Sequence, residues 1–300
     1  MKKVLVTGAT GLIGQRLIQL LNEKEYEVHT LGRRPLYNSR GFQHFLWNVD
    51  TGEIDIRAFE GVSSVIHLAG AGVAEKSWTA AYKKEITASR INGTRLLYNT
   101  IKANGFPIGT FISASAIGIY GDCNDEIIFE NHKPGIGFLA GVCKKWEKEA
   151  IRFAELGMRE VRCRIGIILS ERGGALPELT KTFPLAAYFA QPNLYYSWIH
   201  LDDVCGIIIH ALQHSDLRGA YNVTSPNPLL MKELMHAVCM HYPTRTVLLP
   251  APPFAIKIAM GEMSEMILSS QRCSANRIIE SGYNFKYRTV SEALKAIYKK

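Results

Sequence analysis

The stretch that decides the fold is VLVTGATGLIG, residues 4–14. Its apolar start, residues 4–6, reads as a short β-strand, and three glycines follow at Gly8, Gly11 and Gly14. Leucine and isoleucine then recur every three or four residues, which predicts a helix directly after the glycines. In this order of strand, glycines and helix, the free backbone N–H groups at the helix start can hold phosphates.

The chemistry of such a turn requires small residues at all three places. One glycine lets the chain turn sharply, one lets the backbone approach a pyrophosphate, and one lets helix and strand pack closely. The turn therefore predicts a dinucleotide site, the alternative being a tight turn without a ligand. The residues expected to contact the dinucleotide here are Gly8, Thr10, Gly11, Leu12, Ile13 and Gly14.

The end of the second predicted strand, residues 26–31, indicates which dinucleotide binds. An NAD site usually carries Asp or Glu there for the ribose hydroxyls, but this chain carries Arg33 and Arg34. Guanidinium groups suit a 2′-phosphate, and one such charge-assisted hydrogen bond contributes about 1.5–3 kcal/mol. The sequence favours NADP(H) over NAD(H), with Arg33 as the main contact. Two arginines on a solvated loop are the alternative.

Strands and helices alternate along the first half of the chain. Further strands are expected at residues 42–47, 64–70, 110–115 and 161–169, and long helices at 80–104 and 138–157. This alternation implies right-handed βαβ units and an α/β fold with a doubly wound parallel sheet.

The composition of the sequence changes after about residue 170, where prolines accumulate and the alternation of predicted strands and helices becomes irregular. We expect a cofactor-binding domain over residues 1–170, with residues 198–224 packing back onto it. Residues 171–300 are then a smaller, mainly helical region that binds the substrate.

Composition excludes several classes of function. The 300 residues are 47% hydrophobic and 21% charged, and no apolar run reaches the roughly 18 residues of a membrane helix. The net charge is 35 − 27 = +8, but the basic residues are scattered, which argues against nucleic acid. The six cysteines form no C-x-x-C pair, so we expect free thiols, no metal site and a cytoplasmic location.

Several separated motifs together resemble an extended short-chain dehydrogenase/reductase. They are residues 7–14, Leu68-Ala69-Gly70, Asn92-Gly93-Thr94, Tyr120-Gly121 and residues 198–204. Residues 76–79, Ser89-Arg90, Trp146-Glu147, Gln271-Arg272, residues 281–283 and Phe285 resemble its atypical epimerase-family branch, the nucleoside-diphosphate-sugar-epimerase-like proteins. The resemblance implies a Rossmann fold, bound NADP(H) and a C-terminal substrate domain, and it allows for a homodimer through helices 80–104 and 138–157.

The resemblance and the sheet edge extend the set of expected contacts. Ser113 and Ser115 lie on one face of a strand end, where residues reach the ligand crevice. Additional cofactor contacts are expected at Leu68, Ala69, Gly70, Ser113, Arg164 and Gly166. A substrate pocket is expected at Lys76, Trp78, Trp198 and His200. The alternative for Lys76 is a solvated loop lysine. The alternative for residues 198–202 is a structural cluster in which Asp202 is the helix N-cap.

The catalytic pattern of the superfamily is incomplete in this chain. The resemblance implies a serine, a tyrosine as proton donor or acceptor, and a lysine four residues after the tyrosine. The tyrosine and lysine belong on helix 138–157, where Leu139 and Cys143 stand instead. Ser115 and Tyr120 remain as catalytic candidates, against strand-end hydrogen bonding for the serine and a structural corner for the tyrosine.

The leading hypothesis is an NADP(H)-dependent oxidoreductase or epimerase-like enzyme without the Y-x-x-x-K pair. Its substrate would be a small carbonyl or hydroxyl compound, or a nucleotide-sugar-like molecule. The alternative is an inactive NADP(H)-binding sensor or scaffold, which the missing pair supports directly.

Overall fold

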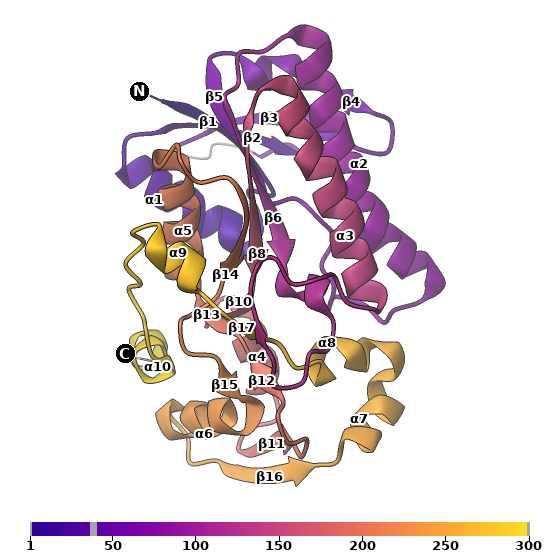
Figure 1. Cartoon of the computed structure of the whole chain (residues 1–300), viewed down its shortest axis with the longest axis vertical. Helices are drawn as coiled ribbons and strands as arrows, with labels where there is room; N and C mark the ends of the chain where they lie inside the picture. Colours follow the sequence, from indigo (N-terminus) through magenta and orange to yellow (C-terminus); the bar gives the residue numbers. More distant parts are fainter. Residues whose placement is uncertain (1, 37–40, 299–300) are drawn as a thin grey trace. The chain divides into compact units, whose positions relative to one another are not determined.

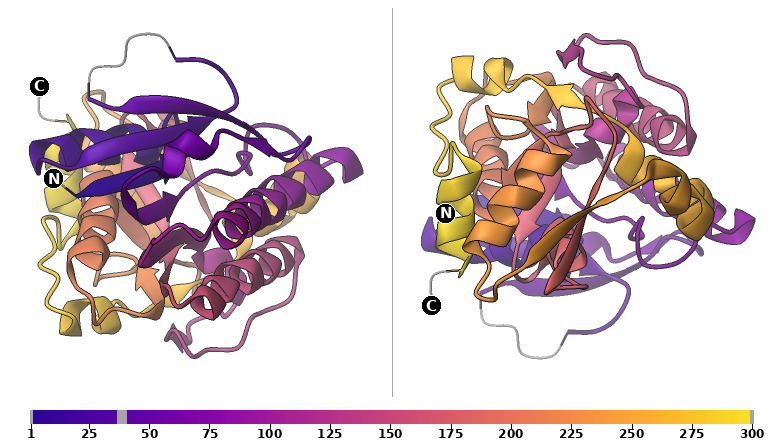
Figure 2. Two further views of the ribbon diagram at one scale, coloured as in Figure 1. Left: turned by 90° about the horizontal axis from the view of Figure 1, so that it is seen from above. Right: turned by 90° about the horizontal axis from the view of Figure 1, so that it is seen from below.

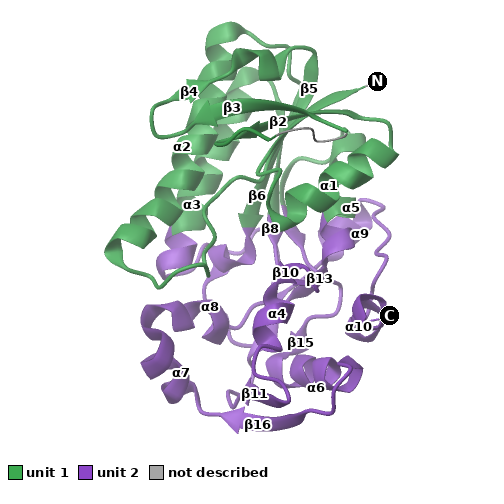
Figure 3. Ribbon diagram, turned by 180° about the vertical axis from the view of Figure 1, so that it is seen from behind, with its two compact units in different colours: residues 1–115, 142–163, 205–220 green, residues 116–141, 164–204, 221–300 purple. Residues whose placement is uncertain are grey.

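The computed structural model describes residues 2–36 and 41–298, and the chain forms two units (Figure 3). Unit 1 comprises Met1–Ser115, Val142–Cys163 and Cys205–Ala220, and unit 2 comprises the rest. The chain therefore passes between the units several times. The expected boundary at residue 170, between a cofactor-binding domain and a substrate-binding region, stays a prediction, because the two units of the structure are divided at other residues.

The described residues contain one sheet of eight strands in the order β14-β8-β6-β5-β1-β2-β3-β4 (Figure 1). β1 pairs in parallel with β2 and β5, β2 with β3, and β5 with β6, whereas β4 pairs antiparallel with β3. The sheet thus grows in both directions from β1, which confirms the doubly wound α/β fold. The strands are β1 (Lys3–Thr7), β2 (Glu27–Gly32), β3 (Gln43–Asn48), β4 (Glu53–Ile54), β5 (Val62–His67), β6 (Thr110–Ala116), β8 (Arg159–Ile165) and β14 (Gly219–Val223).

Helices cover both faces of this sheet (Figure 2). On one face α2 (Ala80–Asn104) lies beside α3 (Phe138–Ile151), and an ion pair of 2.6 Å between Arg95 and Glu149 joins them. On the other face lie α1 (Leu12–Glu23) and α5 (Leu201–Gln213), where the Cys205 thiol donates to the Ile13 carbonyl. Under α2 and α3, the Phe111 and Phe153 rings stack with centroids 3.5 Å apart.

The ends of the helices follow local sequence signals. α2 begins where the Thr79 hydroxyl accepts from the Tyr82 N–H, and it ends at the left-handed Gly105, as the pattern predicts. The helix expected over 138–157 is α-helical only to Ile151 and continues as a 3₁₀ turn, η3 (Arg152–Leu156). The expectation that Asp202 caps α5 is wrong, because Asp202 lies inside the first turn.

The strand expected over 161–169 is broken at Gly166. Its second part, β9 (Ile167–Ser170), leaves the large sheet and pairs with β13 (Trp198–His200) in unit 2. The Gly166 N–H donates to the Val223 carbonyl, and the Ile167 N–H donates to the Ser197 carbonyl. Two successive N–H groups thus bond to two different chain segments, which no pattern of apolar residues predicts.

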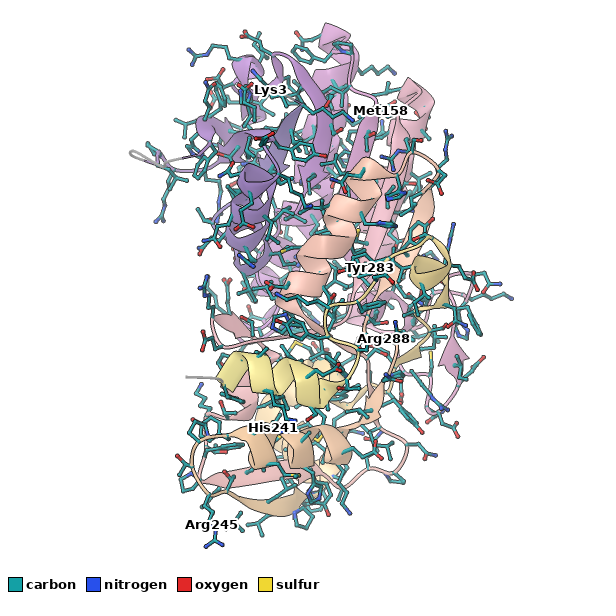
Figure 4. The ribbon with its side chains drawn as sticks, turned by 90° about the vertical axis from the view of Figure 1, so that its left-hand side faces the viewer. Lys3, Met158, His241, Arg245, Tyr283 and Arg288 are labelled. Carbon is teal, nitrogen blue, oxygen red and sulfur yellow. The ribbon has the colours of Figure 1, made fainter. Side chains whose placement is uncertain are left out.

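Unit 2 combines helices with short strand pairs, namely β11 with β16, β12 with β15 and β17 with β7. Its helices α6 and α10 pack together, and the Ser291 hydroxyl lies 3.1 Å from His241 Nε2. Figure 4 labels His241 at the end of α6 and Arg288 just before α10. The remaining elements are η1 (Ile56–Phe59), η2 (Ile117–Tyr120), β7 (Ile127–Ile128), β10 (Gly173–Gly174), α4 (Ala175–Leu179), β11 (Leu185–Phe189), β12 (Tyr195–Tyr196), β15 (Leu229–Leu230), α6 (Met231–His241), β16 (Val247–Ala251), α7 (Pro253–Met260), η4 (Gly261–Ser264), α8 (Glu265–Leu268), β17 (Arg272–Cys273), α9 (Asn276–Glu280) and α10 (Val290–Tyr298).

Two expectations from composition can be compared with this fold. All six cysteines carry free thiols, which confirms that prediction. Within the described part of the chain, no helix is both long and apolar enough to cross a membrane.

Candidate cofactor and active site

The glycine turn after β1 is packed so closely that its glycines have no room for side chains. Gly8 has φ +72°, and a Cβ there would lie 2.8 Å from the Leu68 carbonyl carbon and 2.9 Å from the Ala69 nitrogen. A Cβ on Gly14 would collide with the Gly8 carbonyl oxygen. The turn is therefore held against the end of β5, and helix α1 starts directly on top of it.

The start of α1 is open to an anion. Its N-cap is Gly11, and no side chain caps it. Thr10 and Gly11 are exposed, while Leu12 and Ile13 are half-buried. The positive end of the helix dipole is thus available beside a flat glycine surface, which fits a pyrophosphate.

A buried hydrogen-bond chain fixes the end of β5 beside the turn. The Thr7 hydroxyl accepts from the N–H groups of Leu68 and Ala69, each at 3.2 Å, and lies 2.7 Å from His67 Nδ1. On its other side, His67 Nε2 lies 3.1 Å from the Thr94 hydroxyl of α2. Burial, with a smaller contribution from the charge of Arg90, lowers the pKa of His67 to about 3. His67 is therefore a neutral link between strand and helix near neutral pH.

The end of β2 carries the two arginines at the surface. Arg33 and Arg34 are both exposed. His44 of β3 holds this segment, because its Nδ1 lies 2.8 Å from the Thr30 hydroxyl and its Nε2 lies 2.9 Å from the Arg34 carbonyl oxygen. Sequence reasoning missed His44, which acts through the backbone and has no motif. An exposed pair of guanidinium groups on a fixed backbone fits a 2′-phosphate.

The segment after β5 is tied to α2 by side chains. The Ser89 hydroxyl accepts from the Ala71 N–H at 3.0 Å, and Arg90 Nη1 donates to the Ala71 carbonyl at 2.9 Å. Of the two residues expected here to line a substrate pocket, Lys76 is exposed and Trp78 is buried, with its indole N–H donating to the Val73 carbonyl. The buried Trp78 thus packs beneath the loop and holds its backbone. Gly70 is exposed beside Arg90.

The end of β6 brings Ser115 to a carboxylate. Ser115 donates to Glu147 Oε1 at 2.8 Å, and Arg162 Nη1 donates to Glu147 Oε2 at 2.9 Å. Ser115 and Glu147 are both buried. Ser113, two residues earlier, is also buried and donates to the Ala114 carbonyl. Glu147 entered the sequence analysis only as part of the family resemblance, so the serine–glutamate pair is a feature that sequence reasoning missed.

Tyr120 of η2 lies in a different hydrogen-bond network, inside unit 2. Its hydroxyl donates to Asn222 Oδ1 at 2.7 Å and accepts from Arg164 Nη1 at 2.8 Å. Burial raises the pKa of Tyr120 well above its ordinary value, and the nearby Arg164 guanidinium only partly offsets this. A phenol with both hydrogen-bonding functions satisfied by protein is poorly suited to proton transfer, so this geometry favours a structural corner.

The other predicted contacts in unit 2 also have protein partners. Arg164 donates to the Glu130 carbonyl as well as to Tyr120, and a Cβ on Gly166 would collide with the Ser197 carbonyl oxygen. Trp198 is fully buried and donates to the Asn227 carbonyl. His200 Nδ1 accepts from the Asp202 N–H, so the imidazole caps α5 in place of the expected aspartate. Protein packing thus accounts for these residue types without a ligand.

Unit 2 contains a cavity of about 520 Å³ beside the start of α3. The Glu265 carboxylate, which lines it, accepts from the backbone N–H groups of Phe138 and Leu139. Asp122, Glu262 and Lys257 also line the cavity, together with Phe138 and Leu268. Charged and apolar side chains thus share its walls.

Together, the doubly wound sheet and the glycine turn at the end of its central strand define a protein of the dinucleotide-binding Rossmann class. Residues 4–135 match the model of the NAD dependent epimerase/dehydratase family, and residues 251–297 match a domain of unknown function, DUF1731. An epimerase family protein of Mycobacterium leprae is 32% identical over 296 residues, which cover 97% of this chain and 94% of that protein. The chain belongs to this epimerase family, which confirms the resemblance to extended short-chain dehydrogenases/reductases.

Two solved structures extend the likeness over the whole fold. The human epimerase family protein SDR39U1, isoform 2, solved with NADPH, has a TM-score of 0.86 at 25% identity and covers 99% of both chains. The nucleoside-diphosphate sugar epimerase from Corynebacterium glutamicum has a TM-score of 0.79 at 27% identity and covers 99% of this chain and 58% of that one.

Proposed function

We propose that this protein is an NADP(H)-dependent oxidoreductase or epimerase-like enzyme that works without the Y-x-x-x-K pair. The observation that carries the proposal is the glycine turn, where Gly8 and Gly14 leave no room for a Cβ and the start of α1 is uncapped. The exposed Arg33 and Arg34 support NADP(H) as the cofactor, as does the NADPH in the human relative.

The substrate is proposed to be a small carbonyl or hydroxyl compound, or a nucleotide-sugar-like molecule. The name of the Corynebacterium relative supports the nucleotide-sugar class, and the charged side chains of Asp122, Lys257 and Glu262 in the cavity of unit 2 support hydrogen bonding to a substrate there. The expectations of a homodimer and of a cytoplasmic location stay predictions.

We propose that Ser115 and Glu147 move the proton that the absent tyrosine would move. When bound, the dinucleotide donates or accepts the hydride. Because the Ser115 hydroxyl already donates to Glu147, its lone pairs are free to accept a hydrogen bond from a substrate hydroxyl. On oxidation the substrate proton would pass to Ser115 Oγ while the serine proton passes to the Glu147 carboxylate, and reduction reverses both transfers.

One observation favours a second function, an NADP(H)-binding sensor without catalysis. Tyr120, the phenol nearest in sequence to Ser115, is engaged by Asn222 and Arg164, and Arg162 holds the negative charge of Glu147 through a 2.9 Å ion pair. A carboxylate stabilised in this way is a weaker base. The sensor would share the glycine turn with the enzyme but show no turnover.

The test is a titration of the purified protein with NADPH and NADH at matched ionic strength. We expect NADPH to bind about ten- to a hundredfold more tightly, and Arg33→Ala to remove most of this preference while Gly109→Ala, at a position with open space and no positive φ, leaves it unchanged. Absence of binding by both cofactors would overturn the proposal. Hydride exchange with a panel of ketones and nucleoside-diphosphate sugars, abolished in Ser115→Ala, would separate the enzyme from the sensor.

A further inference from the structure

Arg90 of α2 places a guanidinium group on the backbone that follows β5. Its Cγ and Cζ lie 3.1 Å from the position that a Cβ on Gly70 would take. Nη1 donates to the carbonyl oxygens of Ala71 and Ile86, which are both neutral acceptors. Among the described residues, no ion pair joins Arg90 to a carboxylate. The site therefore holds a positive charge that the protein does not neutralise by direct pairing.

The positive charge of Arg90 affects the pKa of a neighbouring group. Burial lowers the pKa of Arg90, yet the guanidinium still contributes to the low pKa of the buried His67. Charges removed from water are costly unless a partner of opposite charge or an electron-rich group compensates them. A ligand that brings negative charge or acceptor oxygens to this place would supply the compensation.

A second donor lies next to the guanidinium. The Arg90 guanidinium carbon is 5.2 Å from the ring centroid of Trp146 on α3. Trp146 is 5% exposed, and its indole N–H has no hydrogen-bond partner. Buried indole N–H groups nearly always find an acceptor. The indole ring compensates part of the guanidinium charge through this cation–π contact. Its unused N–H, beside a cation without a carboxylate partner, is an independent sign that a polar ligand completes this site.

The site is continuous with the glycine turn. Gly14 packs against Gly8, and Gly8 packs against the backbone of Leu68 and Ala69. Gly70 is the next residue in the chain, and the Arg90 side chain lies against it. In the sheet, β1 lies between β2 and β5. If the 2′-phosphate lies at Arg33 after β2 and the pyrophosphate at the turn after β1, the nicotinamide half points toward the end of β5.

We propose that Arg90, with Trp146 beside it, supplies the fixed positive charge at the nicotinamide end of the bound cofactor. It thereby replaces the lysine that the family places on α3, where Cys143 stands. A fixed cation repels the positively charged oxidised ring and leaves the neutral reduced ring unaffected. The protein should therefore prefer NADPH to NADP⁺. This inference rests on the proposed binding of NADP(H).

The test compares Arg90→Met with Arg95→Met. Arg95 is on the same helix but is paired with Glu149, so its variant is a matched control for loss of one charge. Dissociation constants for NADPH are measured by fluorescence, and those for NADP⁺ by competition. We expect the ratio of the NADP⁺ constant to the NADPH constant to fall about tenfold in Arg90→Met, or about 1.4 kcal/mol, and to stay unchanged in Arg95→Met.

A merely structural role of Arg90 predicts a different result, because loosening the loop would weaken both cofactors equally. An unchanged ratio therefore overturns the inference, even if both affinities fall, while failure of the wild type to bind either cofactor overturns the proposed function itself. Should Arg90→Met not fold, Arg90→Lys and Arg90→Gln are compared with the wild type. The lysine variant keeps the charge and must keep the ratio, whereas the glutamine variant must lower it, and equal ratios in the two variants contradict the fixed charge.

Discussion

Replacing His67 by glutamine should make the protein less sensitive to acid. His67 links β5 to Thr7 on one side and to Thr94 on the other, and its pKa is lowered from 6.5 to about 3, first by burial and then by Arg90. A glutamine can still accept from one threonine and donate to the other. It does not bind a proton in this range of pH.

The magnitude follows from proton linkage. Above pH 6.5 the imidazole is neutral in both the folded and the unfolded chain, so the free energy of unfolding does not depend on it. Between pH 6.5 and about 3 only the unfolded chain binds the proton, and stability falls by about 1.4 kcal/mol per pH unit. Over 6.5 − 3 = 3.5 units this amounts to about 5 kcal/mol, of which about 2 kcal/mol is lost by pH 5.

The assay is urea unfolding of wild type and His67→Gln at pH 7 and pH 5. At pH 7 the variant should be the less stable protein, because the ring also stacks on Phe111 at 6.1 Å. Between the two pH values the variant should lose about 2 kcal/mol less than wild type. His214→Gln, which removes an exposed imidazole, should keep the wild-type difference. Equal losses in wild type and His67→Gln would refute a neutral His67 in the folded state.

Three further predictions concern the turn and unit 2. Gly14→Ala should weaken NADPH binding at least about tenfold and cost about 1–3 kcal/mol of stability, because its Cβ collides with backbone; both are measured by titration and urea unfolding. Tyr120→Phe should cost about 1–3 kcal/mol, by removing one acceptor of Arg164 and the donor to Asn222 Oδ1, yet leave the NADPH dissociation constant unchanged; a loss of binding with normal stability would contradict the structural role. Asp203→Asn should release the segment around Tyr283, labelled in Figure 4, because this buried carboxylate accepts from the Tyr283 hydroxyl and from two backbone N–H groups. Faster hydrogen exchange over residues 283–287 is the expected readout.

The parts of the fold that could be predicted from the sequence are those set by neighbours along the chain. The strand, glycine turn and helix at the start need only residues 4–21, and the long helix α2 is bounded by local signals at Thr79 and Gly105. Figure 4 labels Lys3 and Met158, which mark where β1 and β8 start at one edge of the sheet. The glycine turn therefore had to lie at the opposite edge, where parallel strands end and ligands bind.

The parts that could not be predicted depend on contacts between distant residues. Ser115 meets Glu147 across 32 residues, and Tyr120 meets Asn222 across 102. No periodicity records which polar side chain a buried hydroxyl will meet. The boundary of the units was equally hidden, since the chain changes units inside continuous strands such as β8.

The loss of the tyrosine–lysine pair has a physical counterpart in this fold. Cys143 on α3 is buried and interacts electrostatically with Arg90. A lysine at that position would add a second cation near a guanidinium that forms no ion pair with a carboxylate among the described residues, and like charges repel each other. We therefore expect Arg90 to disfavour a lysine at this position of α3. A chain with a small thiol there can keep the charge near β5 by supplying it from α2. Under the proposed function, the cation comes from α2 instead of α3, and the proton transfer that the resemblance assigns to a tyrosine is proposed to fall to Ser115 and Glu147, which are joined by a hydrogen bond.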